Sequence, residues 1–139
     1  MRDEDIVVEE LKIGGADEEE RRIFSPKGEM AQVLNRPGEA FRHLVYWDLD
    51  TPRTGQERGH HLHPVKTDRL YVLRGELLFV VEDPSTRERR VLRAGAGTRI
   101  TIAPGMAHAF RSTSYCQVLE YSPTAFDPAD SRPYRLEGW

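Results

Sequence analysis

The fold of this chain is constrained most by a series of short apolar runs that turn residues separate. No stretch has the apolar spacing of a long helix, whereas Gly, Pro, Asn and Asp interrupt the chain every few residues after Ile23. The runs cover residues 30–34, 41–49, 69–81, 90–92, 99–103, 107–111 and 117–121. Many short strands with this punctuation predict an all-β sandwich or barrel. The periodicity alone does not distinguish a jelly roll from an immunoglobulin-like fold or another β fold.

The length of 139 residues fits one domain with one hydrophobic core. Within this domain we expect an N-terminal arm over residues 1–28, a barrel core over 29–122 and a C-terminal tail over 123–139. The tail contains three prolines and shows little regular pattern.

Charge and cysteine content argue against several classes of partner. The net charge is −3, and Lys and Arg are interleaved with acidic residues, so no nucleic-acid partner is expected. No apolar run approaches the roughly 20 residues that cross a bilayer, so no membrane partner is expected. Residues 2–5 lack the order of a secretory signal, and the single Cys116 cannot form an intramolecular disulfide. We therefore expect a cytoplasmic protein in which Cys116 is an inert buried thiol, with Tyr46 and Trp47 in the core.

Four of the five histidines lie in two short segments, residues 58–63 and 104–108. On a strand, His61 and His63 point to the same side, and His60 points to the opposite side. Pro64 interrupts this strand, so the chain can bend and return an acidic residue, Asp68, to the same pocket.

The second histidine segment supplies one further imidazole, since Gly105 permits a tight turn and His108 follows on the next run. Three imidazoles and a carboxylate form a plausible site for a divalent first-row metal with open positions for water or substrate. Without a metal, the same groups provide a base and the partner that orients it. A single histidine on a strand is more often a packing residue, so the argument depends on the two segments together.

These segments resemble the two sequence motifs of the cupins. The first motif, His-x-His followed by an acid and a Gly, matches His61, His63, Asp68 and Gly75. The second, a Gly, then Pro-Gly and a His, matches Gly97, Pro104, Gly105 and His108. The resemblance covers roughly residues 41–121 and implies the cupin double-stranded β-helix, a jelly-roll β-sandwich barrel.

The resemblance also implies a metal site at His61, His63, Asp68 and His108, for Zn, Fe, Mn or Ni. Asp68 departs from the family pattern, which usually has a Glu there. Because Asp is one methylene shorter, Asp68 is either a ligand of shorter reach or a hydrogen-bond partner that fixes a histidine tautomer.

Residues 58–63, Arg-Gly-His-His-Leu-His, are similar to the Arg-Gly-x-His segment of nucleotide-linked 4-keto-6-deoxysugar epimerases and 3,4-ketoisomerases. This similarity implies that His61 is the general base, and the ketoisomerases carry a second histidine where this chain has His63. The tail, at residues 126–128 and 132–134, is loosely similar to the ends of cupins from sugar biosynthesis.

The implied chemistry is removal of a proton next to a keto group, with stabilisation of the enolate. We expect His61, Asp68 and Tyr121 to be the catalytic residues. The residues expected to bind substrate are Arg58, Lys66, Tyr71 and Arg99, with the cations placed to receive a diphosphate.

Three functions stay open at this point: a sugar-nucleotide epimerase or ketoisomerase, a metallocupin such as a phosphosugar isomerase or dioxygenase, and a non-catalytic sugar-binding domain. All three predict a small-molecule ligand, a carbohydrate in the first and third. Exposed strand edges are usually paired, so we also expect a homodimer, to which Ile6, Val7 and Val8 could add a strand on the partner.

Overall fold

A computed structural model describes all 139 residues. The chain forms thirteen strands, one short helix and one 3-10 turn. In chain order these elements are η1 (Asp3–Asp5), β1 (Ile6–Glu10), β2 (Lys12–Ile13), β3 (Arg21–Ser25), β4 (Gly28–Gln32), β5 (His43–Leu49), α1 (Thr51–Thr54), β6 (Arg58–Leu62), β7 (Asp68–Arg74), β8 (Glu76–Glu82), β9 (Arg89–Gly95), β10 (Thr98–Ile102), β11 (Ala107–Ser112), β12 (Cys116–Ser122) and β13 (Arg132–Pro133). No helix is long and apolar enough to cross a membrane.

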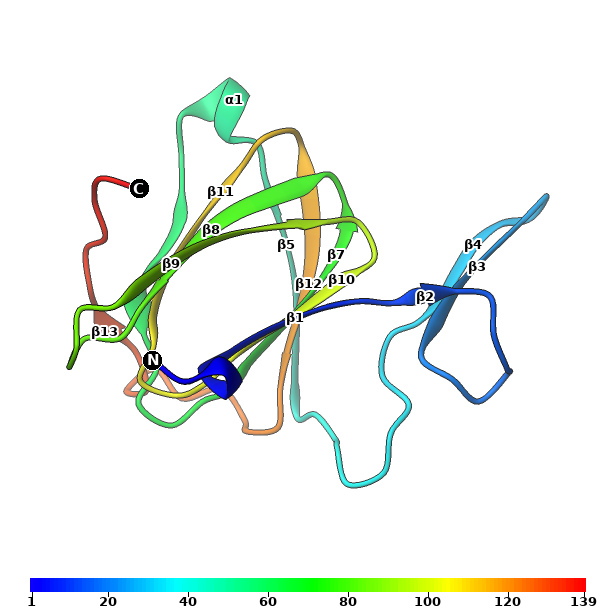
Figure 1. The fold of residues 1–139 in the computed structure, drawn as a ribbon, viewed down its shortest axis with the longest axis horizontal. Helices are drawn as coiled ribbons and strands as arrows, with labels where there is room; N and C mark the ends of the chain where they lie inside the picture. The colour runs from blue at the N-terminus through cyan, green and yellow to red at the C-terminus, as the bar shows by residue number, and fades with distance from the viewer.

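Ten of the strands form two five-stranded antiparallel sheets. The first sheet has the strand order β1-β10-β7-β12-β5, and the second has the order β13-β6-β11-β8-β9. The prediction of an all-β sandwich is confirmed. The sheets face each other (Figure 1), because side chains from both form one apolar core. β9 and β10 are in contact at one side of the sandwich, whereas β5 is an edge strand of the first sheet at the other.

Alternation along the strands sorts side chains between the core and the outer face. On β7, Leu70 and Val72 belong to the core, as the period of two predicts, and Leu73 faces outward. On β5, Trp47 is buried in the core, but Tyr46 is 52 % exposed on the opposite face. The expectation that Tyr46 belongs to the core was therefore wrong, because adjacent residues of a strand point to opposite faces. Cys116 is fully buried, as expected.

The N-terminal residues build two different structures. Ile6–Glu10 pairs as β1 with β10 of the same chain, so this segment is part of the barrel and not a strand added to a partner. Its apolar residue Ile6 is buried in the core, which accounts for the intramolecular pairing. Strands β2, β3 and β4 form a separate small sheet that projects from the barrel (Figure 1).

The C-terminal tail lies along the second sheet. Its short strand β13 pairs with β6, and the Tyr134 amide donates a 2.8 Å hydrogen bond to the His60 carbonyl. Leu136 is buried in a smaller apolar cluster on this side. The tail therefore covers the strand that carries His61.

Candidate functional site

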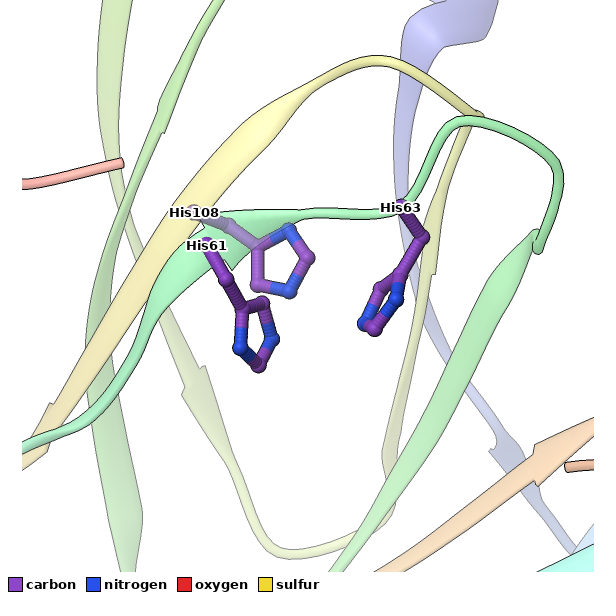
Figure 2. A group of neighbouring side chains, drawn as sticks. All are labelled: His61, His63 and His108. Carbon is purple, nitrogen blue, oxygen red and sulfur yellow. The ribbon is translucent and has the colours of Figure 1, made fainter. Parts of the chain in front are cut away.

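The site is built around three histidines from two neighbouring strands. His61 on β6 pairs in register with His108 on β11, and His63 follows directly after β6. Figure 2 shows the three rings turned toward a common space. One nitrogen from each ring lies within 4.8 Å of the others, so the two sequence segments are brought together as the motifs predict.

The backbone before His61 explains why the rings come so close. Gly59 has a φ of 88°, and a Cβ there would lie 2.7 Å from the His108 carbonyl oxygen. Only glycine lets β6 approach β11 this closely without displacing that carbonyl. His60, next in the chain, has a φ of 58°, so its side chain leaves the histidine cluster. Its Nε2 contacts the Glu57 carboxylate at 2.9 Å, and its Nδ1 accepts the Leu136 amide.

Asp68, the first residue of β7, is buried beneath the histidines. Its Oδ2 lies 3.2 Å from His108 Nε2 and 3.6 Å from His63 Nε2. Its Oδ1 forms a 2.9 Å ion pair with Lys66 Nζ. Burial raises the pKa of Asp68, but the hydrogen bond and charge of His108 together with the Lys66 ammonium outweigh burial and hold this pKa well below its usual range. Asp68 is therefore a carboxylate that is already neutralised by its neighbours.

His61 differs from the other two histidines: each of those rings is hydrogen-bonded to a backbone carbonyl, whereas the His61 side chain makes no hydrogen bond to the protein. Burial lowers the pKa of His61 to about 4, and the electrostatic interaction with the adjacent imidazoles of His108 and His63 contributes in the same direction. At neutral pH His61 is an uncharged imidazole with a free nitrogen, which is what a general base requires.

The other two rings are held by backbone carbonyls. The Nδ1 atoms of His63 and His108 lie 2.5 Å from the Asp130 carbonyl oxygen and 3.1 Å from the Met106 carbonyl oxygen. A carbonyl only accepts, so each Nδ1 carries a proton and donates. This arrangement turns the Nε2 atom of each ring toward Asp68.

Lys66 and Glu120 complete the charged part of the site. Lys66 Nζ pairs with Glu120 Oε1 at 3.0 Å, and Glu120 Oε2 accepts a 2.8 Å hydrogen bond from Trp47 Nε1. Burial lowers the pKa of Lys66, but the two carboxylates outweigh burial and raise it. Sequence analysis missed Glu120. The available signal was its register, because Glu120 alternates with Val118, a fully buried core residue of β12.

Two cavities meet at His61. The first, of about 470 Å³, opens beside β5 and is lined by His61, Asp68, His108, Glu120 and aromatic residues. The second, of about 320 Å³, lies between His63, Lys66 and residues 125–131 of the tail. His61 lines both cavities.

Arg58 lies at the rim of the first cavity. Its guanidinium stands 5.2 Å over the Trp47 ring, and its Nε donates to the Asp48 carbonyl at 3.0 Å. Its two terminal nitrogens make no hydrogen bond or ion pair with the protein, so Arg58 keeps a forked pair of donors for a ligand.

Three of the residues expected at the site are on the opposite face of the first sheet. Tyr71 and Tyr121 follow the inward residues Leu70 and Glu120, so alternation turns both phenols outward. Tyr121 lines an apolar groove on this outer face. Arg99 is bound to Glu9 at 2.9 Å and to Glu20 at 3.0 Å, where it fastens the N-terminal segment to the barrel. The structure therefore does not place these three side chains at the histidines.

Lys66 also differs from its expected role. It reaches the site, but its ammonium is shared between two carboxylates, so it offers no free charge to a diphosphate.

The donor set fits a metal only in part. The three imidazoles can converge on one cation, since one nitrogen from each ring lies within 4.8 Å of the others. Asp68, in contrast, already contacts His108 Nε2 and Lys66 Nζ. The residues therefore match a three-histidine site, without Asp68 as a fourth ligand.

No family model and no curated protein matches this chain in sequence. Among solved structures, a dTDP sugar isomerase from Desulfovibrio desulfuricans G20 has a TM-score of 0.76 at 16 % identity, covering 95 % of this chain and 85 % of that chain. The TDP-quinovose 3,4-ketoisomerase from Campylobacter jejuni has a TM-score of 0.72 at 14 % identity, with 92 % of each chain covered. dTDP-4-dehydrorhamnose 3,5-epimerase from Bacillus anthracis has a TM-score of 0.68 at 15 % identity, covering 91 % of this chain and 83 % of that chain. The chain thus has the RmlC-like cupin jelly-roll fold that its motifs predicted.

Proposed function

We propose that this cupin is an isomerase that epimerises or keto-isomerises a nucleotide-linked keto-sugar, with His61 as the general base. The observation that carries the proposal is the state of His61, an uncharged and unanchored imidazole that lines both cavities. The structural likeness to dTDP-sugar isomerases and epimerases supports this choice of substrate class.

The reaction begins when His61 removes the proton from the carbon next to the keto group, which leaves an enolate. In a 4-keto sugar that carries a 3-hydroxyl, this proton comes from C3. Return of a proton to C4, with transfer of the 3-hydroxyl proton to the other oxygen, gives the 3-keto isomer. Return of a proton to the opposite face of C3 gives the epimer instead.

The developing negative charge requires donors in the same cavity. Lys66 has three N–H donors and uses two of them on Asp68 and Glu120, which leaves one for the ligand. His108 lines the first cavity and is held by Asp68, so its ring is fixed in place before substrate arrives. Arg58, at the rim, is the side chain we assign to the diphosphate.

The test is incubation of TDP-4-keto-6-deoxyglucose with the protein in heavy water. We expect deuterium at the carbon next to the keto group and an isomerised product, both lost in His61→Asn, which replaces the imidazole by a smaller polar amide that is not basic. Binding without deuterium uptake by the wild-type protein would instead support a non-catalytic sugar-binding domain.

A second candidate is a metallocupin of another class, favoured by the three histidine nitrogens within 4.8 Å of one another. His61, His63 and His108 would hold the ion, which would supply Lewis-acid or redox chemistry when bound. Elemental analysis of protein purified without an affinity tag tests this candidate. Stoichiometric Zn, Fe, Mn or Ni that is lost in His108→Ala supports it, whereas turnover by a metal-free protein contradicts it.

We also propose that the protein is a homodimer that associates through the outer face of the first sheet. Leu44, Tyr46 and Leu73 are exposed there by 54 %, 52 % and 38 %, on a face that a solvated sheet would keep polar. Light scattering tests the assembly, and a monomer at every concentration would refute it. The cytoplasmic location stays a prediction from the sequence.

A further inference from the structure

One residue of the C-terminal tail, Asp130, makes one contact with His63 and two with the turn that follows it. Its Oδ1 accepts the Val65 amide at 2.8 Å, and its Oδ2 accepts the Lys66 amide at 2.9 Å. Its backbone carbonyl accepts the proton on His63 Nδ1 at 2.5 Å. Asp130 lies more than sixty positions later in the sequence, so only the fold brings these groups together.

These three bonds hold the turn between β6 and β7, where the chain has no strand partner. Pro64 has no amide to donate, and the next two amides are both bound by the one carboxylate. The only other backbone anchor of this turn is the His63 carbonyl, which accepts the Gly105 amide at 2.8 Å. The direction in which Lys66 leaves the backbone therefore depends on Asp130.

The bond to His63 has a chemical consequence. Because Nδ1 donates to a carbonyl, this bond keeps a proton on Nδ1 and turns Nε2 toward Asp68, whose Oδ2 lies 3.6 Å away. The same tautomer presents Nε2 to substrate in an isomerase and to the ion in a metallocupin. The bond between His63 and the Asp130 carbonyl therefore positions the ring in the same way whichever of the two functions is correct.

The stretch of the tail before Asp130 has few other attachments, whereas β13 after it pairs with β6. Residues 123–129 are exposed, and the polar contacts of this stretch are local ones, such as the Asp127 carboxylate with the Ala129 amide at 2.9 Å. Asp130 is the point at which this stretch meets the histidine segment. The same stretch forms a wall of the second cavity.

We propose that Asp130 is a positioning residue that sets the tautomer of His63 and the direction of Lys66, so that the C-terminal tail completes the site. The effect on catalysis rests on the proposed function, but the effect on His63 does not. Asp130 acts through its neighbours and needs no contact with the reacting atoms.

The test compares Asp130→Ala and Asp130→Asn with Glu137→Gln. Glu137 is an exposed carboxylate of the same tail whose side chain contacts only Arg135. Long-range 15N–1H NMR spectra of the imidazoles report which nitrogen of His63 carries the proton. We expect Nδ1–H in the wild-type and Glu137→Gln proteins. Asp130→Ala keeps the backbone carbonyl that His63 Nδ1 binds but removes the two carboxylate bonds that hold residue 130 against the turn, so we expect the carbonyl to move and the signature to be lost.

Asp130→Asn keeps one acceptor oxygen and nearly the same volume, so we expect a folded protein with an intermediate His63 signature. In turnover assays we expect kcat to fall about tenfold or more in Asp130→Ala and less in Asp130→Asn, with KM changed little. An unchanged His63 signature in both variants would overturn the inference, whatever the turnover. Absence of turnover in the wild-type protein, with the tautomer shift still present, would refute the proposed function alone.

Discussion

The two faces of the first sheet carry the same kinds of residue and use them differently. On the inner face, Asp68 and Glu120 place carboxylates beside an ammonium and imidazoles that line cavities. On the outer face, Arg99 is bound to two glutamates that fasten the N-terminal segment, and Tyr121 lies in an apolar groove. A charged residue of this sheet thus contributes to the candidate site when it lies on the inner face, and holds another segment against the barrel when it lies on the outer face.

The difference between the two faces is tested most strongly by Asp68→Ala. This substitution removes the inner-face carboxylate that lies between Lys66 and the imidazoles of His63 and His108. The variant leaves Lys66 and His108 without their buried partner, and breaking such a pair costs about 3–5 kcal/mol. We expect this loss in the free energy of unfolding, measured by urea denaturation, together with loss of turnover. Asp3→Ala, at a fully exposed carboxylate, should change stability by less than about 0.5 kcal/mol. Equal losses in the two variants would contradict the central place of Asp68.

Neighbouring residues of β12 give a matched test of the two faces. Glu120→Gln weakens the ion pair with Lys66 on the inner face, and we expect kcat to fall about tenfold or more. Tyr121→Phe removes a buried outer-face hydroxyl that has no hydrogen-bond partner. We therefore expect nearly unchanged turnover and a stability that is equal or slightly higher. Loss of turnover in Tyr121→Phe would restore the catalytic role that the sequence suggested.

The pH dependence of turnover sharpens the assignment of His61. Burial lowers the pKa of His61 to about 4, from an ordinary value near 6.5. The base is active when it is unprotonated, so kcat/KM should stay level as pH falls below 6 and decline only as pH approaches about 4. A decline centred near pH 6.5 would contradict the buried, neutral state of this ring.

The same shift has a consequence for stability. Between about pH 4 and 6.5 the unfolded chain binds a proton at His61 and the folded chain does not, so stability falls as pH falls through this range. His61→Asn should remove this part of the pH dependence, as measured by thermal unfolding at several pH values.

The sequence predicted the sandwich, the meeting of the two histidine segments and the return of Asp68 to the same pocket, because each depends on local periodicity or on paired motifs. It did not predict the partners of the tail. Asp130 binds the histidine segment through backbone groups, and no residue pattern marks such a contact. The predictions for Tyr121 and Arg99 were wrong for a different reason. Their residue types suit the chemistry, but alternation along their strands places both side chains on the outer face of the sheet.

Glu120 shows that alternation along a strand can also identify a site residue that the motifs do not contain. A charged residue at an inward position of a strand must find partners, because burial of an unpaired charge is costly. Its alternation with Val118 was visible in the sequence, so inward charges on predicted core strands are useful candidates for a site.

The smallest expected effect concerns Cys116, on the inner face but away from the cavities. The thiol is fully buried, and burial raises the pKa of Cys116 to about 12. Because the thiolate is the reactive species, the folded protein should resist iodoacetamide at pH 8 and react only when denaturant exposes the core. Mass spectrometry of the alkylated protein measures this, with the unfolded chain as the reference for full reaction. Rapid alkylation of the folded protein would mean that the core between the sheets opens readily, and the rigid placement of Asp68 and Glu120 would then have to be reconsidered.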